Sequence, residues 1–72
     1  MSDALEFEGT IIDSNHNVFR VECEIGGHKR IIQTRVAGRL YMRHIRITPG
    51  DRVKIEVSPY DLSRGRIVYR IR

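Results

Sequence analysis

The chain has 72 residues and a mass of 8.4 kDa, which is enough for one compact domain and too little for a second hydrophobic core. We therefore expect residues 1–72 to form a single domain. A deep substrate pocket is not expected, because short chains have little core to spare for one. Hydrophobic residues make up 40% of the chain and charged residues 31%, a balance that favours a soluble globular fold over disorder.

The single cysteine, Cys23, cannot form an internal disulfide, whereas small secreted domains usually carry several. No window approaches the run of about 18 apolar residues that a membrane span needs. The first residues, MSDALEFEG, are acidic where a signal peptide would be basic and apolar. We therefore expect a cytoplasmic protein that does not enter a membrane.

The net charge of +4 is unevenly distributed along the chain. Residues 1–36 hold four Lys or Arg against six Asp or Glu, whereas residues 37–72 hold nine against three. Eleven of the 13 cations are Arg, whose planar guanidinium binds phosphate through two hydrogen bonds and stacks on bases. The basic second half points to a polyanion such as nucleic acid as the partner, although charge alone fits a solvated surface equally well.

Apolar and polar residues alternate in several segments, which is typical of strands with one buried face. Gly9 interrupts the first segment at a place where a long strand can bend or bulge. In the last segment the alternation predicts that Ile67, Tyr69 and Ile71 face the core, and Phe19 is expected in the core as well. The five predicted strands cover residues 5–13, 18–25, 29–36, 52–58 and 66–71.

The connections carry their own signals. Gly26-Gly27 predicts a tight hairpin between the second and third strands, and residues 49–51 (PGD) predict a turn before the fourth. Residues 58–65 (SPYDLSRG) predict an eight-residue loop between the fourth and fifth strands. Residues 37–44 show no alternation, so we expect a short helix or an irregular turn there.

Five strands with one helical connection between the third and fourth match the OB-fold, a Greek-key barrel that binds oligonucleotides. We therefore predict an all-β protein: a five-stranded antiparallel OB-fold barrel with a short helical turn between strands three and four. An SH3-like or Sm-like barrel is the alternative on strand count alone. The order of the elements favours the OB-fold.

No catalytic or metal-binding arrangement is evident in the sequence. Cys23 falls on an inward strand position, where a thiol packs as a small hydrophobe. The spacing of His16, His28, His44 and Cys23 lacks the paired motifs that close a zinc site. There is no glycine-rich phosphate loop either. We therefore expect no enzyme activity, no cofactor and no bound metal.

The basic residues of the second half fall on predicted connections and strand ends, which an OB-fold can gather on one side. Arg residues bind phosphates there, and an aromatic ring can stack on a base. The five aromatic residues are scattered, which favours recognition of shape and backbone over base-specific contacts. The predicted RNA- or DNA-binding residues are Arg39, Tyr41, Arg43, His44, Arg46, Arg64, Arg66 and Arg70.

Three segments of the second half resemble bacterial translation initiation factor 1: residues 45–47 (IRI), 49–53 (PGDRV) and 58–70 (SPYDLSRGRIVYR). The resemblance covers residues 45–70 almost without a gap. It implies a monomeric, non-catalytic OB-fold protein that binds the small ribosomal subunit at its A site. There it would contact 16S rRNA and a neighbouring ribosomal protein, exclude tRNA, and assist initiation factors two and three.

The middle of the chain departs from that family. Family members usually read HISGKMR where residues 35–41 read RVAGRLY. Tyr41 therefore stands where the family has Arg, and Arg43 is the candidate to replace the lost cation. His44 stands where the family has Tyr and can still stack. Two alternatives remain: a general OB-fold RNA chaperone, and a ribosome-associated protein-interaction module that uses the acidic first half.

Overall fold

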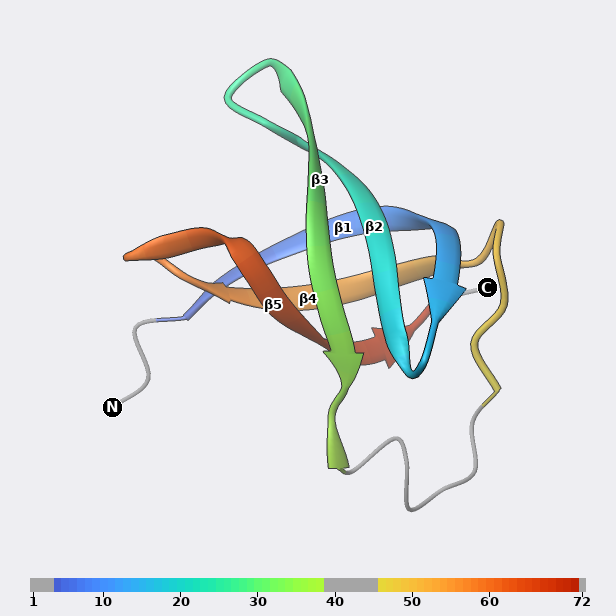
Figure 1. The fold of residues 1–72 in the computed structure, drawn as a ribbon. Coiled ribbons are helices and arrows are strands. Elements are labelled where there is room, and N and C mark those ends of the chain that lie inside the picture. Colours follow the sequence, from blue (N-terminus) through green and yellow to red (C-terminus); the bar gives the residue numbers. More distant parts are fainter. Residues whose placement is uncertain (1–3, 39–45, 72) are drawn as a thin grey trace.

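The computed structural model describes residues 4–38 and 46–71 (Figure 1). Its elements are five strands: β1 (Leu5–Asn15), β2 (Val18–Ile25), β3 (His28–Val36), β4 (Arg52–Ser58) and β5 (Asp61–Arg70). They form a closed barrel in the order β1-β2-β3-β5-β4, and β4 pairs back onto β1. The predicted all-β, five-stranded OB-fold barrel is confirmed.

One of the five strand pairings departs from the antiparallel prediction. β3 and β5 run parallel, pairing residues 33–36 with residues 64–67, whereas the other four pairs are antiparallel. The reason is geometric: strand direction cannot alternate all the way around a closed ring with an odd number of strands. At least one neighbouring pair must be parallel, and here it is the pair that joins β3 to β5.

β1 is a long strand that pairs with two neighbours and thereby closes the barrel. Residues 5–10 pair with β4, and residues 9–15 pair with β2. A Cβ atom at Gly9 would lie 2.5 Å from both Cys23 Sγ and Val21 Cγ1, closer than packed atoms approach. Gly9 therefore lets β1 pass directly over β2 where it changes partner.

The β1–β2 and β2–β3 hairpins each turn through two residues with positive φ. His16 and Asn17 have φ angles of 51° and 67° in the turn between β1 and β2. Gly26 and Gly27 have φ angles of 61° and 81° in the turn between β2 and β3. Two-residue turns with positive φ match the twist of antiparallel strands. The hairpin predicted at Gly26-Gly27 is therefore confirmed.

The predicted eight-residue loop between the fourth and fifth strands is wrong. Ser58 pairs with Asp61, so only Pro59 and Tyr60 lie between β4 and β5. Polar side chains hold this turn from within, because Ser58 Oγ accepts a hydrogen bond from the Tyr60 N–H (3.1 Å) and Asp61 Oδ1 accepts one from the Ser63 N–H (3.1 Å). Residues that suggested a loop therefore begin a strand, which includes Arg64 and Arg66.

The helical turn predicted between strands three and four is not supported. All elements of the described residues are strands, and residues 39–45 of the predicted turn lie outside the described part. The predicted turn at residues 49–51 is confirmed: Gly50 has a φ of 94°, and the Asp51 N–H donates to the Thr48 carbonyl (3.1 Å). Ile47, just before it, is buried and anchors this segment in the core.

The core fills the inside of the barrel and contains side chains from every strand. Phe7 and Phe19 are partly buried and pack against it, as expected for Phe19. Thr34 is the buried polar residue of the described part, and its Oγ1 donates to the Phe19 carbonyl at 2.9 Å. The core residues are Ile11, Val21, Cys23, Ile32, Ile47, Val53, Ile55, Val57 and Ile67.

A bulge near the end of β5 overturns two further expectations. Ile67 pairs with Ile55 and Tyr69 pairs with Lys54, so Val68 is an extra residue on β5. One extra residue reverses the alternation of side chains that follow it. Tyr69, predicted to face the core, is 57% exposed, and Ile71 is also exposed.

Candidate nucleic-acid interface

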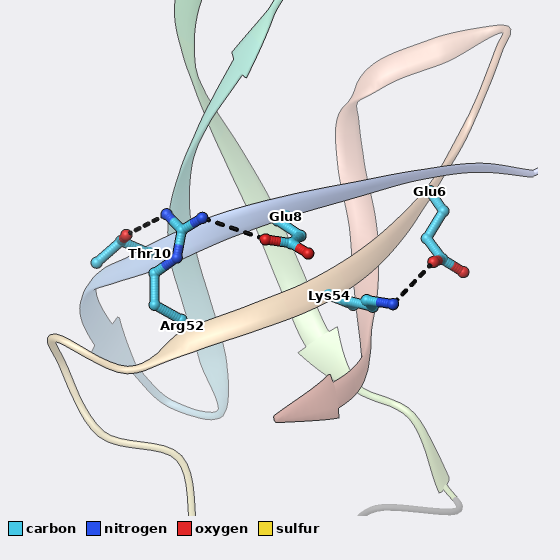
Figure 2. A network of polar contacts seen from close by, with 5 residues as sticks. All are labelled: Glu6, Glu8, Thr10, Arg52 and Lys54. Atoms are coloured by element: carbon cyan, nitrogen blue, oxygen red, sulfur yellow. Dashed lines mark hydrogen bonds and ion pairs between the residues drawn. The ribbon is translucent and has the colours of Figure 1, made fainter. Parts of the chain in front are cut away.

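The outer face formed by β1 and β4 carries charges that pair with one another (Figure 2). The Arg52 guanidinium donates to Thr10 Oγ1 at 3.0 Å and, more weakly, to Glu8 Oε2 at 3.4 Å. Lys54 Nζ lies 3.7 Å from Glu6 Oε1. We call this surface the paired face, defined by Glu6, Glu8, Arg52 and Lys54. Its charges balance, so it offers no excess positive charge to a polyanion.

The outer face formed by β3 and β5 has a different charge pattern. Gln33 pairs with Arg64 and Arg35 pairs with Arg66 across the parallel strands. Ile32 and Thr34 point into the barrel, so the residues between and beyond them on β3 point outward. We call this surface the basic face, defined by Gln33, Arg35, Arg64 and Arg66.

Two of the three cations on the basic face form no ion pair in the described part of the chain. The Arg66 guanidinium donates to Glu56 Oε1 from Nε (3.2 Å) and Nη2 (3.0 Å). Arg35 and Arg64 form no ion pair with any described residue. Arg20, on β2 next to Gln33, is held 3.2 Å from Asp13. Arg35 and Arg64 are therefore the cations of this face that can accept a new anionic partner without breaking an ion pair to a described residue.

Arg64, Gly65 and Arg66 form a ridge between two shallow grooves. The groove on the β3 side has a volume of about 520 Å³ and is lined also by Val18, Gln33, Thr34 and Arg35. The groove on the β4 side has a volume of about 460 Å³ and reaches Pro59 and Tyr60. A Cβ atom at Gly65 would lie 2.6 Å from the Glu56 carbonyl oxygen. The absence of a side chain at Gly65 thus allows β5 to pack close to β4.

The spacing on the basic face follows from strand geometry. Arg64 and Arg66 are two residues apart on one strand, which separates their Cα atoms by about 7 Å, and neighbouring strands lie about 5 Å apart. Arg35 and Arg66 are opposite one another across the parallel pair. Three guanidinium groups therefore stand within reach of neighbouring phosphates of one nucleic-acid strand.

An exposed aromatic ring lies at one end of the ridge. Tyr60 is 90% exposed and shares the second groove with Arg64. Next to it, hydrogen bonds from the Ser63 hydroxyl and N–H lower the pKa of Asp61, with a smaller contribution from Arg64. An exposed tyrosine beside an arginine can stack on a base while the guanidinium binds the adjacent phosphate.

The eight residues predicted to bind nucleic acid do not all lie at the same place in the structure. Arg64 and Arg66 come together on the ridge. Arg46 is exposed and forms no ion pair with a described residue, but it does not belong to the described lining of either groove. The remaining predicted connection residues lie outside the described part, so their role stays a prediction: Arg39, Tyr41, Arg43 and His44.

Arg70 does not share a side of β5 with Arg66, contrary to the sequence-based expectation. The bulge at Val68 pairs Arg70 with Val53, an inward position, whereas Arg66 pairs with the outward Glu56. Arg70 Nε instead lies 3.5 Å from Asp51 Oδ2. Its role in nucleic-acid binding stays a prediction.

Sequence reasoning missed Gln33 and Arg35. Their signal is present, because they alternate with the buried Ile32 and Thr34. It was obscured by the adjacent Ile31 and Ile32, which break the alternation. Arg35 also lies in the half of the chain with excess acidic residues, so the charge balance of that half concealed it.

Two candidates for reactive or metal-binding chemistry can be checked in the described residues: the Cys23 thiol and clusters of metal-ligating side chains. Burial raises the pKa of the Cys23 thiol to about 11, and Glu22 adds to this while Arg52 opposes it. The thiol is therefore protonated at neutral pH and is a poor nucleophile. Among residues 4–38 and 46–71, no group of three His, Cys, Asp or Glu side chains could hold a metal. The same residues contain no helix that could cross a bilayer.

Comparison with known proteins places this geometry among OB-fold proteins. The chain is similar to translation initiation factor 1 from the Wolbachia endosymbiont strain TRS of Brugia malayi, with 33% identity and a TM-score of 0.71 over 96% of this chain and 79% of that one. It is also similar to YjeQ from Thermotoga maritima (24% identity, TM-score 0.75) and to YloQ, a circularly permuted GTPase (22% identity, TM-score 0.80).

The two kinds of match differ in what they show. The matches to YjeQ and YloQ cover 94% of this chain but only 23% of each of those proteins, and at these identities the likeness shows the fold alone. No family model matches the chain. The closed five-stranded barrel in the order β1-β2-β3-β5-β4 defines an OB-fold protein. The identity with the initiation factor then gives the family: the chain belongs to the translation initiation factor 1 family.

Proposed function

We propose that this chain is an RNA-binding protein of translation initiation that binds the small ribosomal subunit through 16S rRNA. The similarity to translation initiation factor 1 supports a role in translation initiation. The observation that carries the proposal is the basic face, where Arg35 and Arg64 stand side by side with Gln33 and without ion pairs to described residues.

The shape of the basic face favours a folded RNA as the ligand. Its grooves are shallow and open to solvent, so it does not enclose a small molecule. Guanidinium groups bind phosphate oxygens through two hydrogen bonds and report the position of the backbone rather than the base. The Gln33 amide, which both donates and accepts, suits the 2′-hydroxyl that distinguishes RNA from DNA. Such a surface recognises backbone shape.

The finer parts of the proposal rest on the resemblance of residues 45–70 to initiation factor 1. In this proposal the protein occupies the A site, excludes tRNA from it and touches a neighbouring ribosomal protein. It assists initiation factors two and three, acts as a monomer in the cytoplasm, and catalyses no reaction. The connection with Arg39, Tyr41, Arg43 and His44 adds RNA contacts to those of the basic face.

Chemical footprinting of 16S rRNA on purified small subunits tests this proposal. We expect the protein to protect nucleotides confined to the A-site region, and the protection to be lost with Arg64→Ala. Lys54→Ala removes a cation from the paired face and is the matched control, so it should leave the footprint unchanged. Protection spread over the subunit, or full displacement by an equal amount of unstructured RNA, would indicate a general RNA chaperone instead.

A further inference from the structure

β3 is paired on both edges along only part of its length. Residues 33–36 pair with β5, whereas residues 28–32 pair with β2 alone. Figure 1 shows the cause: β2 and β3 continue together as a projecting hairpin, while β5 turns away from β3. We call residues 28–32 of β3 the open edge.

The open edge presents main-chain groups without partners among the described residues. In an antiparallel pair, every second residue directs its N–H and C=O away from the neighbouring strand. No described strand pairs with this side of residues 28–32, and no backbone hydrogen bond from elsewhere in the described part reaches it. Such an edge is a template for one more strand.

The side chains along the open edge have a definite character. Arg30 is exposed and forms no ion pair with a described residue. Lys29 Nζ lies 3.8 Å from Glu22 across the hairpin, but both side chains are exposed, so this pair is weak. Ile31 is 45% exposed. The edge thus combines one unpaired and one weakly paired cation with one uncovered apolar side chain, and it contains no proline or bulge that would block pairing.

We propose that the open edge binds one extended acidic segment of another protein, which adds to β3 as a sixth strand. Main-chain hydrogen bonds hold the segment in register. Its carboxylates pair with Arg30 on one face of the sheet, and an apolar residue covers Ile31 on the opposite face, because consecutive strand residues point to opposite faces. This surface is separate from the basic face, so the proposal stands independently of RNA binding.

Charge and chemistry exclude the other occupants. Antiparallel pairing of two copies along this edge would bring the Lys29 and Arg30 cations of both copies together, and like charges on neighbouring strands destabilise a sheet. A nucleic acid offers phosphate acceptors but no row of alternating donors and acceptors at the spacing of a strand. An acidic polypeptide satisfies both the backbone and the cations.

A short synthetic peptide of alternating Glu and Val tests the proposal against the whole chain labelled with nitrogen-15. We expect peptide addition to shift the amide resonances of residues 28–32 and to slow their hydrogen exchange. A peptide of the same sequence, N-methylated at alternate residues, keeps the charge but loses the donors, and it should not bind. This comparison needs no variant of the protein.

Arg30→Glu tests the charge requirement and should weaken peptide binding about three- to tenfold. Arg46→Glu makes the same charge change on the segment that leads into β4 and should leave the affinity unchanged. The proposal is overturned if the N-methylated peptide binds equally well, if no amide of the open edge responds at millimolar peptide, or if oligouridylate shifts the same amides at lower concentration. Self-association in sedimentation, with protection of these amides in the dimer, would overturn it as well.

Discussion

The paired face and the basic face use the same residue types in opposite ways. On the paired face, β1 supplies carboxylates against the cations of β4, so each charge is balanced nearby. On the basic face, the register sets Arg35 against Arg66, two cations across one strand pair. Like charges opposite one another destabilise a sheet. Glu56 offsets the charge of Arg66, so the second arrangement leaves the positive charge of Arg35 without a compensating carboxylate among the described residues.

In our proposal the register, rather than the number of cations, decides which surface binds a polyanion. Four of the described cations in the basic half of the chain are held by carboxylates: Arg52, Lys54, Arg66 and Arg70. Net charge counts all of them equally. Sites that bind ligands commonly give up some stability for function, and we propose that the basic face is such a site.

The largest expected effect on the free energy of unfolding comes from replacing Gly9 in β1, a strand of the paired face, or Gly65 in β5, a strand of the basic face. Gly9→Ala and Gly65→Ala each place a Cβ atom within 2.6 Å of a packed neighbour, and overpacking of this kind costs about 1–3 kcal/mol. Urea unfolding should show both losses. Gly38→Ala is the control, because no described atom lies within 4 Å of its Cβ position. Equal stability of all three variants would contradict the packing described for β1 and β5.

Arg35→Ala should separate binding from stability. Because Arg35 has no ion pair with a described residue and faces Arg66, its removal relieves repulsion and should leave the melting temperature unchanged or slightly higher. Affinity for small subunits should fall about tenfold, the equivalent of about 1.4 kcal/mol. A lower melting temperature with unchanged affinity would assign Arg35 to the structure.

Cys23 lies beneath the paired face, and its raised pKa should make the stability of the protein depend on pH in the alkaline range. Burial raises its pKa to about 11 from 9.0, so the unfolded chain loses the thiol proton at a lower pH than the folded chain. The contribution to stability is complete below pH 9.0 and is lost as the pH rises through about 11. The stability advantage of the wild type over Cys23→Ala should therefore shrink by on the order of 1 kcal/mol near pH 10. A constant difference across this range would show that the thiol is not desolvated.

Lys54→Ala should have the smallest effect. Its ion pair with Glu6 is 3.7 Å long and both side chains are about half exposed, and such pairs contribute about 0–1 kcal/mol. Thermal unfolding at low and high salt should give nearly the same small loss. A loss well above this range would mean that the paired face stabilises the barrel cooperatively.

The sequence predicted the strands of this barrel well because each depends on local alternation. The positions of Val21, Val53 and Ile55 in the core follow directly from it. Tyr69 was misplaced because the bulge at Val68 arises from pairing with β4. The turn at Pro59-Tyr60 was predicted too long, since the same polar residues that suit loops also form the side-chain hydrogen bonds that tighten a turn.

The candidate site was predicted less completely for a related reason. Arg64 and Arg66 were identified from charge and from the resemblance to a family, but their partners depend on neighbouring strands. Glu56 pairs with Arg66 only because β4 and β5 share a register, and Arg35 joins Arg64 only because β3 and β5 run parallel. Contacts between strands distant in the sequence leave no local pattern, so free and paired cations look alike in the chain.

The most direct test of this account is the salt dependence of binding to purified small subunits by three proteins. They are the wild type, the double variant Arg35→Ala/Arg64→Ala on the basic face, and Arg52→Ala/Lys54→Ala on the paired face, which removes the same charge. The logarithm of the binding constant falls with the logarithm of the salt concentration, with a contribution of about 0.7–0.9 for each neutralised phosphate. The account predicts a slope shallower by about 1.4–1.8 for the basic-face variant and an unchanged slope for the paired-face variant. Equal changes in both variants would contradict it, because net charge rather than the basic face would then govern binding.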